Sequence, residues 1–100
     1  MNKVKVQITS EDIEKGVSTT RRCPIALALE KILVPTYIPY VNVNGVQFRL
    51  ASTGATQYTA DLTPDALAFL TCFDLKYKVT PCEIELEIPS FYLRHEEEVI

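Results

Sequence analysis

The dipeptide Asn44-Gly45 constrains the fold of this chain more than any other local feature. Apolar residues occupy alternate positions on both sides of it, at Val41, Val43, Val46, Phe48 and Leu50. Asn-Gly is favoured in the two-residue type I′ turn of β-hairpins, because both central positions of that turn need a positive φ. The pattern predicts a hairpin over residues 38–51. Pro35 and Pro39 remove backbone donors, so we expect the first strand of this hairpin near a sheet edge.

Three further segments show the period-2 alternation of half-buried strands. They are residues 3–8, 57–62 and 83–88. In the last of these, Ile84, Leu86 and Ile88 face one way while Glu83, Glu85 and Glu87 face the other. We expect this acidic row to be a solvated strand face with Lys or Arg across from it. One β-strand carries its charges too far apart to imitate duplex DNA, which has one charge per about 1.7 Å of its axis.

Helical signals occupy three other segments. A capping box of Thr9 and Asp12 predicts a helical turn over residues 10–15, ended by Gly16 in a left-handed conformation. Pro24 opens a helix over residues 23–33, and Thr63-Pro64-Asp65 opens another that runs to about residue 74. The expected apolar stripe of that helix is Leu67, Phe69, Leu70 and Phe73. The order of elements predicts an α+β fold with a small antiparallel or mixed sheet of about four to five strands and two helices packed on one face.

Composition indicates one soluble domain. The chain has 100 residues, of which 47% are hydrophobic and 23% charged, and this is ordinary for a globular protein that folds unaided. The net charge of −3 argues against a general phosphate-backbone binder. The chain lacks an apolar run of about 18 residues and a signal-peptide pattern at its start, so we expect a cytoplasmic protein without a membrane segment. The three scattered cysteines do not form a disulfide pattern.

The segment Thr20-Arg21-Arg22-Cys23 directly precedes the helix that starts at Pro24 and is the main candidate site. A cysteine at a helix N-terminus beside cations has a stabilised thiolate, which is how reactive cysteines arise. Catalysis also needs a base, and no local motif brings the one histidine, His95, near Cys23. Two interpretations stay open: the arginines and the helix amides hold an anion, or the loop is solvated and Cys23 packs as a small apolar residue.

Two other groups of residues are candidate sites. Cys23, Cys72, Cys82 and His95 make a Cys₃His set, but their wide spacing is unlike the close ligand pairs of zinc sites, so we expect neither a metal nor a cofactor. Tyr37, Tyr40, Phe91 and Tyr92 are candidate interface aromatics, and with open strand edges they make a protein partner or a homodimer reasonable. If these aromatic rings fill the core, they indicate nothing about partners.

Two blocks of this chain carry distinctive motifs. In the first block, Glu11-Asp12-Ile13 and Gly16 lead to the helix Cys23-Pro24-Ile25-Ala26-Leu27-Ala28. In the second, Phe69 and Phe73-Asp74 precede Val79 and Pro81. The two blocks resemble those of a group of short uncharacterised proteins of phages and bacterial genomes, which commonly have an aromatic residue where this chain has Cys82. The resemblance implies a phage or prophage setting and no particular activity.

From the resemblance and the missing catalytic sets we expect a non-enzymatic interaction protein that binds, and inhibits, a host macromolecule such as a defence complex. The alternative is a small anion-binding or nucleotide-sequestering protein that uses the loop of Arg21 and Arg22 and the N-terminus of the following helix.

Overall fold

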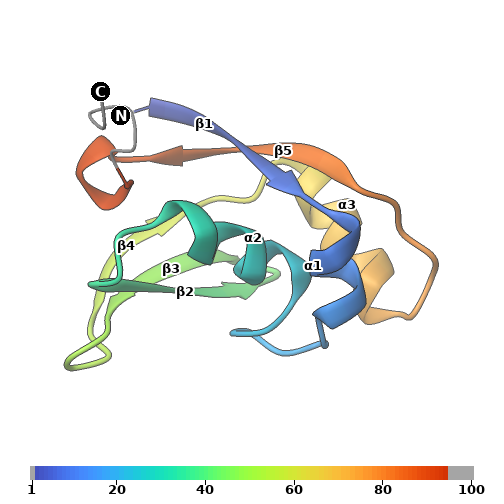
Figure 1. The fold of residues 1–100 in the computed structure, drawn as a ribbon, viewed down its shortest axis with the longest axis horizontal. Helices are drawn as coiled ribbons and strands as arrows, with labels where there is room; N and C mark the ends of the chain where they lie inside the picture. Colours follow the sequence, from blue (N-terminus) through green and yellow to red (C-terminus); the bar gives the residue numbers. More distant parts are fainter. Residues whose placement is uncertain (1, 95–100) are drawn as a thin grey trace.

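The computed structural model describes residues 2–94 and contains five strands, three α-helices and one 3₁₀ turn (Figure 1). In chain order the elements are β1 (Asn2–Ile8), α1 (Ser10–Lys15), α2 (Pro24–Ile32), β2 (Tyr37–Asn42), β3 (Gly45–Leu50), β4 (Thr56–Ala60), α3 (Pro64–Asp74), β5 (Cys82–Ile88) and η1 (Ser90–Tyr92). The predicted α+β class is confirmed. His95 and the residues after it lie outside the described residues.

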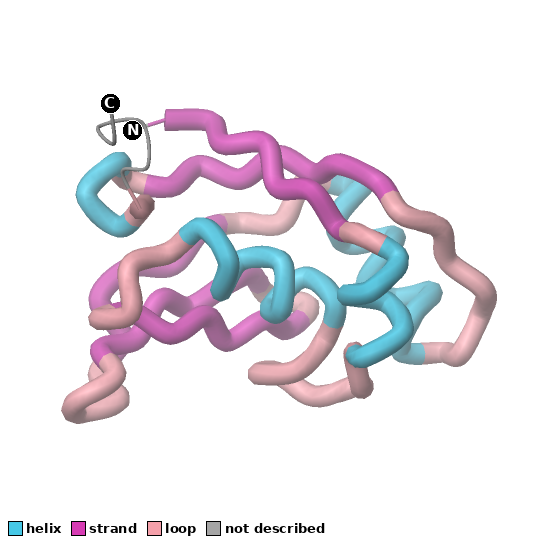
Figure 2. Tube along the Cα trace, viewed as in Figure 1, coloured by secondary structure: helices cyan, strands magenta, loops and turns pink. Residues whose placement is uncertain are grey.

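The strands form two antiparallel sheets, one of β1 and β5 and one in the order β2-β3-β4. Helix α2 packs against β1 of the first sheet and β2 of the second, so it lies between the two layers (Figures 1 and 2). The five predicted strands are therefore divided between two sheets. The prediction that β2 is an edge strand is confirmed. Pro39 is tolerated there because, by the alternation of the strand, its backbone points away from β3 as that of Val41 does, so it needs no N–H to pair with β3.

The core lies between the sheets and around α2. Ile25, Ala26 and Leu29 of this helix are completely buried, as are Phe48 of β3 and Ile88 of β5. Burying a large apolar side chain contributes about 1.5–3 kcal/mol relative to leaving it in water, so this packing is the main force that joins the two sheets.

Helix α3 buries a narrower face than the sequence predicts. Ala66, Phe69 and Leu70 are buried, whereas Leu67 is 37% exposed. Positions 66, 69 and 70 follow the i, i+3, i+4 spacing of a single helix face. The prediction that Leu67 belongs to the buried stripe is wrong, because it lies one residue off that face.

The turn of the β2–β3 hairpin differs from the predicted one. Asn42 pairs with Gly45, so Val43 and Asn44 form the turn. Gly45 has a φ of +135°, but Asn44 does not have a positive φ, and the predicted type I′ turn is therefore wrong. Gly45 is needed for space as well, because a Cβ on it would lie 2.5 Å from the carbonyl oxygen of Ala60 on β4.

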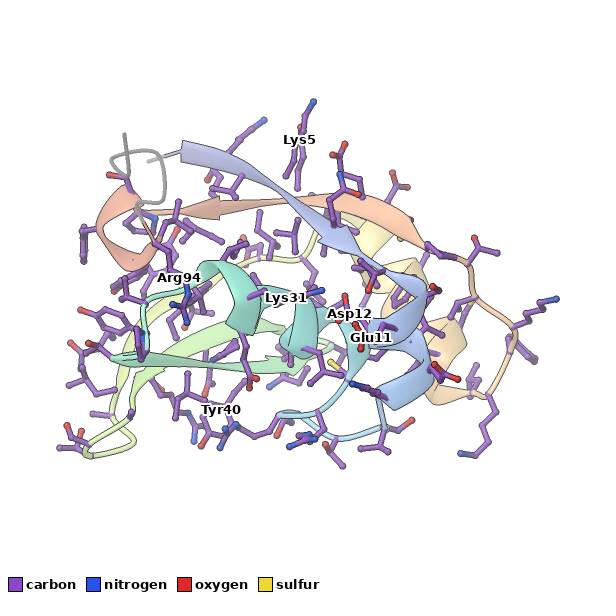
Figure 3. The ribbon with its side chains drawn as sticks, in the orientation of Figure 1. Lys5, Glu11, Asp12, Lys31, Tyr40 and Arg94 are labelled. Atoms are coloured by element: carbon purple, nitrogen blue, oxygen red, sulfur yellow. The ribbon has the colours of Figure 1, made fainter. Side chains whose placement is uncertain are left out.

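Helix α1 begins at a capping box and is bound to α2 through Asp12. The predicted capping box is confirmed: Asp12 N–H donates to Thr9 Oγ1 at 3.2 Å, and Thr9 N–H donates to Asp12 Oδ2 at 3.0 Å. The same Oδ2 accepts from Lys31 Nζ of α2 at 2.9 Å (Figure 3). The predicted left-handed stop at Gly16 is wrong, because its φ is −73°. Position 16 requires glycine for a different reason, because a Cβ there would lie 2.8 Å from Pro24 Cδ.

The ribbon of β1 and β5 has the predicted charged outer face. Lys3 pairs in register with Glu87, and Lys5 pairs with Glu85. All four side chains are exposed. The expectation that lysines lie across from the acidic row is confirmed, and directly opposed charges of opposite sign support this register.

Candidate functional site

The loop before α2 is held against the hairpin. The carbonyl of Thr20 accepts the Val41 N–H of β2 at 2.9 Å, and Arg22 N–H donates to Thr19 Oγ1 at 3.1 Å. The side chains of Thr20 and Arg22 are exposed. The backbone of the predicted anion loop is therefore fixed, and the side chain of Arg22 extends into solvent.

Cys23 occupies the N-cap position of α2 and is 1% exposed. Burial raises the pKa of its thiol, and the backbone N–H groups of Ala26 and Ile25, which favour the thiolate, do not offset this effect. A buried, protonated thiol is a poor nucleophile. Pro24, Ile25 and Ala26 are buried too, so the N-terminus of α2 faces the core and not the solvent.

Arg21 turns away from the helix N-terminus toward β2. Its guanidinium carbon lies 5.4 Å from the centre of the Tyr40 ring, and that of Arg49 lies 4.0 Å from the same ring. Both distances are within the range of cation–π attraction. Arg21 Nη2 also lies 3.9 Å from Glu30 Oε2, and Arg49 donates to Gln47 Oε1 from Nε and Nη2. The structure thus brings Arg21 to Tyr40, a predicted interface aromatic, and leaves Arg22 apart from this cluster.

The other predicted interface aromatics lie at the opposite end of the hairpin, where the C-terminal segment returns. Tyr92 is 4% exposed and packs against Tyr37, with ring centres 4.3 Å apart, and against Phe48 at 5.6 Å. Phe91 lies over Tyr92 at 4.5 Å but is 64% exposed. Tyr92 is therefore a core residue, and Phe91 is the exposed member of this group.

A second group of exposed apolar residues lies outside the predicted sites. Val17, Val43, Leu75 and Tyr77 are 51–64% exposed. They come from the loop after α1, the hairpin turn and the segment that follows α3. Together with Lys76 and Lys78 we call them the end surface, since the segment after α3 forms the right-hand end of the molecule in Figure 1.

Two neighbouring clefts join the parts of the end surface. A cleft of about 350 Å³ is lined by Val17 and Ser18 on one side and by Tyr77 and Lys78 on the other. A second cleft, of about 250 Å³, shares Ser18 and reaches Val43 of the hairpin turn. Val17, Val43 and Tyr77 thus line two adjoining clefts, and Leu75 precedes Lys76 and Tyr77 in the chain. The charged residues that line these clefts are Lys76 and Lys78 at the first and Asp74 at the second.

Lys76 holds the only positive φ among the non-glycine residues of the described chain, at 66°. It follows the C-cap of α3, where Lys76 N–H donates to the Phe73 carbonyl at 3.0 Å and Tyr77 N–H donates to the Cys72 carbonyl at 2.9 Å. This pair of bonds is the Schellman motif, whose left-handed position is usually glycine. A lysine in this conformation is strained, and strained residues are common at functional sites.

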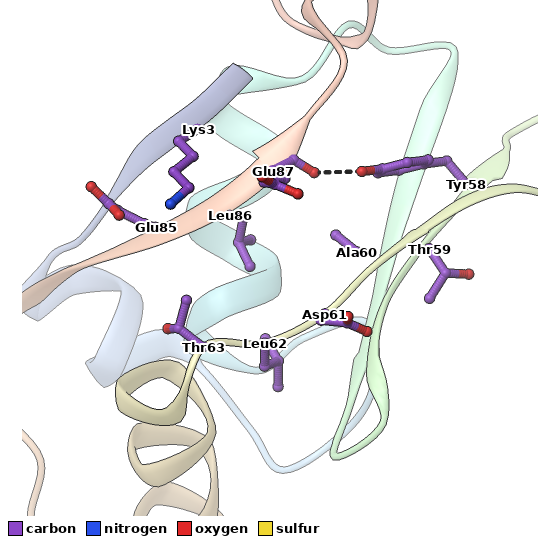
Figure 4. A pocket seen from close by; sticks show the side chains of 10 residues that line it. All are labelled: Lys3, Tyr58, Thr59, Ala60, Asp61, Leu62, Thr63, Glu85, Leu86 and Glu87. Atoms are coloured by element: carbon purple, nitrogen blue, oxygen red, sulfur yellow. Dashed lines mark hydrogen bonds between the residues drawn. The ribbon is translucent and has the colours of Figure 1, made fainter. Parts of the chain in front are cut away.

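A further cleft, of about 340 Å³, lies between β4 and β5, the facing strands of the two sheets (Figure 4). The hydroxyl of Tyr58 donates to the Glu87 carbonyl at 2.8 Å across it. Burial and the nearby carboxylates of Glu87 and Asp61 raise the pKa of Tyr58, so its hydroxyl stays a donor. This contact ties the sheets together, and the cleft beside it carries carboxylates of Asp61, Glu85 and Glu87 with one cation, Lys3.

In residues 2–94, no group of three or more His, Cys, Asp or Glu side chains is arranged to hold a metal ion. In the same part of the chain, none of the helices is both long enough and apolar enough to cross a membrane.

Fold and surfaces together define a small two-sheet α+β protein with a buried thiol and an end surface of exposed apolar and charged side chains. Comparison with known proteins adds no family: no protein-family model, no curated protein and no solved structure matches the chain. The resemblance to short phage and bacterial proteins therefore stays a prediction.

Proposed function

We propose that this chain is a non-enzymatic interaction protein, encoded by a phage or prophage, that binds a host protein through its end surface. One observation carries the proposal. Six large hydrophobic residues are exposed in the described chain, and four of them, Val17, Val43, Leu75 and Tyr77, belong to this surface. Contiguous exposed apolar area is typical of a protein-binding site, and scattered apolar residues are not.

The chemistry of the end surface also suits a protein partner. Interface cores are rich in aromatic and aliphatic side chains and carry their charges at the rim. Here Tyr77 lies beside a cleft, with Lys76 and Lys78 next to it along the chain. The strain at Lys76 supports the same conclusion, because glycine would serve the helix end better and lysine adds only a cation to the surface.

Affinity capture from a bacterial lysate tests the proposal with matched variants. The double variant Val43→Ser, Tyr77→Ser removes apolar area from both clefts, while Leu67→Ser removes an exposed apolar residue that lies elsewhere, on α3. We expect the wild type and Leu67→Ser to retain the same protein in stoichiometric amount, and the double variant to retain at least tenfold less. Equal recovery by all three folded proteins, or recovery by none, contradicts the proposal.

The second candidate is anion binding at Arg21. It is favoured by the two guanidinium groups of Arg21 and Arg49 on one ring and by Arg21 Nε, which is buried without a hydrogen-bond partner in the described structure. Titration with inorganic phosphate, followed by NMR at the arginine side chains, tests it. Binding that is lost in Arg21→Gln and kept in Arg94→Gln, an exposed arginine whose backbone bonds to the C-terminal end of α2, supports an anion site. Unchanged arginine signals at millimolar phosphate refute it.

A further inference from the structure

One edge of β1 has no strand beside it. In the described residues β1 pairs only with β5, through seven residues in continuous register from Asn2↔Ile88 to Ile8↔Cys82. Of the common means of protecting an edge, β1 has two lysines, Lys3 and Lys5, but no proline and no bulge. The free edge of β1 is therefore regular enough to pair with another strand.

The hydrogen bond between Tyr58 and the Glu87 carbonyl, drawn in Figure 4, indicates which backbone groups of β1 point to its free edge. The Glu87 carbonyl accepts from Tyr58 on the other sheet, so it is directed away from β1. In an antiparallel pair both backbone groups of a residue point to the same side, and residues that face each other are either both bonded or both unbonded. Lys3, the partner of Glu87, therefore directs its N–H and C=O away from β5. By the same alternation Lys5 and Gln7 do so as well, and these three residues present alternating donors and acceptors to solvent.

Charge decides which strand suits this edge. Lys3 and Lys5 are exposed on the outer face of β1, Lys3 also lines the cleft beside Glu85 and Glu87, and the carboxylates of the acidic row lie one strand farther from the free edge. Neighbouring strands are about 4.8 Å apart, so a strand added to β1 lies next to the lysines and roughly 10 Å from the carboxylates. Acidic side chains on the outer face of an added strand therefore meet opposite charges directly across.

The same charges disfavour a second copy of this chain as the occupant. An antiparallel β1–β1 pair with full overlap of the three free residues places Lys5 opposite Lys5 and Lys3 opposite Gln7. Like charges directly across a strand pair are destabilising. A partner of opposite charge has no such penalty.

We propose that the free edge of β1 binds an extended acidic segment of a partner protein as an added strand. The segment alternates acidic side chains, which face outward beside Lys3 and Lys5, with apolar side chains on its inner face. Backbone hydrogen bonds from Lys3, Lys5 and Gln7 hold it, as in other complexes formed by strand addition. This site is separate from the end surface and does not depend on it.

NMR with isotope-labelled protein tests the proposal. The probe is a synthetic heptapeptide that alternates glutamate with valine and threonine, and the control peptide has lysine in place of glutamate. In the free protein we expect the amides of Lys3, Lys5 and Gln7 to exchange rapidly with solvent and those of Val4 and Val6 to be protected. Saturation with the acidic peptide should slow exchange at the first three amides by at least tenfold and leave Val4 and Val6 unchanged.

A charge-swapped variant separates the edge from general electrostatics. Lys5→Glu combined with Glu85→Lys keeps the pair across β1 and β5 and the net charge, but reverses the charge next to the added strand. We expect about fivefold weaker binding of the acidic peptide and tighter binding of the lysine peptide. The proposal is overturned if the acidic peptide leaves the three amides unprotected at millimolar concentration, if its shifts map to another surface, or if the swap does not change the preference.

Discussion

Replacing Lys76 by glycine should stabilise this protein. Lys76 has a φ of 66°, and the two hydrogen bonds of the Schellman motif, at 3.0 and 2.9 Å, hold it in that conformation. Its side chain is exposed and makes no contact that glycine would remove from the core. The substitution therefore changes the backbone energy at one position and the charge of the end surface.

The magnitude follows from two opposing effects. A residue with a Cβ is disfavoured in the left-handed conformation by about 1–2 kcal/mol. Glycine has more freedom in the unfolded chain, which offsets about 0.5–1 kcal/mol of that gain. We expect Lys76→Gly to raise the free energy of unfolding by about 0.5–1 kcal/mol, or the Tm by roughly 2–8 °C for a domain of this size.

Urea and thermal unfolding of three variants measure this effect. Lys76→Ala removes the same charge but keeps a Cβ, so it should not stabilise. Lys78→Gly adds a glycine to the same loop where φ is not positive, so it should be neutral or destabilising. If Lys76→Gly is no more stable than Lys76→Ala, the left-handed strain is not the cause and the reasoning is refuted.

Three further predictions concern the buried contacts. Gly16→Ala should lower the free energy of unfolding, measured in urea, by about 1–3 kcal/mol, because the added Cβ would lie 2.8 Å from Pro24 Cδ. An unchanged urea midpoint contradicts this steric explanation. Lys31→Met should destabilise by about 1 kcal/mol at neutral pH, because Asp12 keeps its bond to Thr9 but loses its cation. Burial raises the pKa of Asp12, but the bonds from Thr9 and Lys31 outweigh burial and leave this pKa lowered. The carboxylate thus stabilises the fold above its ordinary pKa, and unfolding at a series of pH values should show the difference between Lys31→Met and wild type shrinking as the pH falls through the lowered pKa. Finally, Ellman's reagent should label half-buried Cys72 and Cys82 before Cys23 in the native protein, and prior labelling of Cys23 would contradict its burial and raised pKa.

Local patterns predicted the elements well, because each element carries its own signal. The alternation of residues 83–88 and the Thr63-Pro64 start of α3 both depend on nearest neighbours in the chain, and both segments have the predicted structure. The predictions that were wrong concern tertiary contacts. The sequence predicts a left-handed conformation for Gly16, whereas the residue that requires glycine there is Pro24, eight residues later in the chain. No local pattern reports such a contact.

The hairpin shows the same limit within a few residues. Asn44-Gly45 correctly indicated a turn, but the strands pair with Asn42 opposite Gly45, one residue away from the preferred type I′ register. The third strand explains the difference, because Gly45 lies against the Ala60 carbonyl of β4 and has no room for a Cβ. Glycine at position 45 therefore allows β3 and β4 to approach closely. The sequences of β2 and β3 alone do not predict this contact with β4.

The end surface was not predictable because its apolar members lie in three separate loops. Val17, Val43 and Tyr77 are isolated hydrophobic residues in polar surroundings along the chain, and only the tertiary fold brings their loops to two adjoining clefts. The marker of this surface comes from the structure. Helix α3 ends at Asp74, and Lys76 takes the left-handed position that is usually glycine in a Schellman motif. Helix α2 also ends without glycine, yet Leu33 at its C-cap stays extended with a φ of −91°, so the missing glycine alone predicts no strain. The positive φ of Lys76 is what directs attention to a surface where a side chain has been kept at the expense of stability.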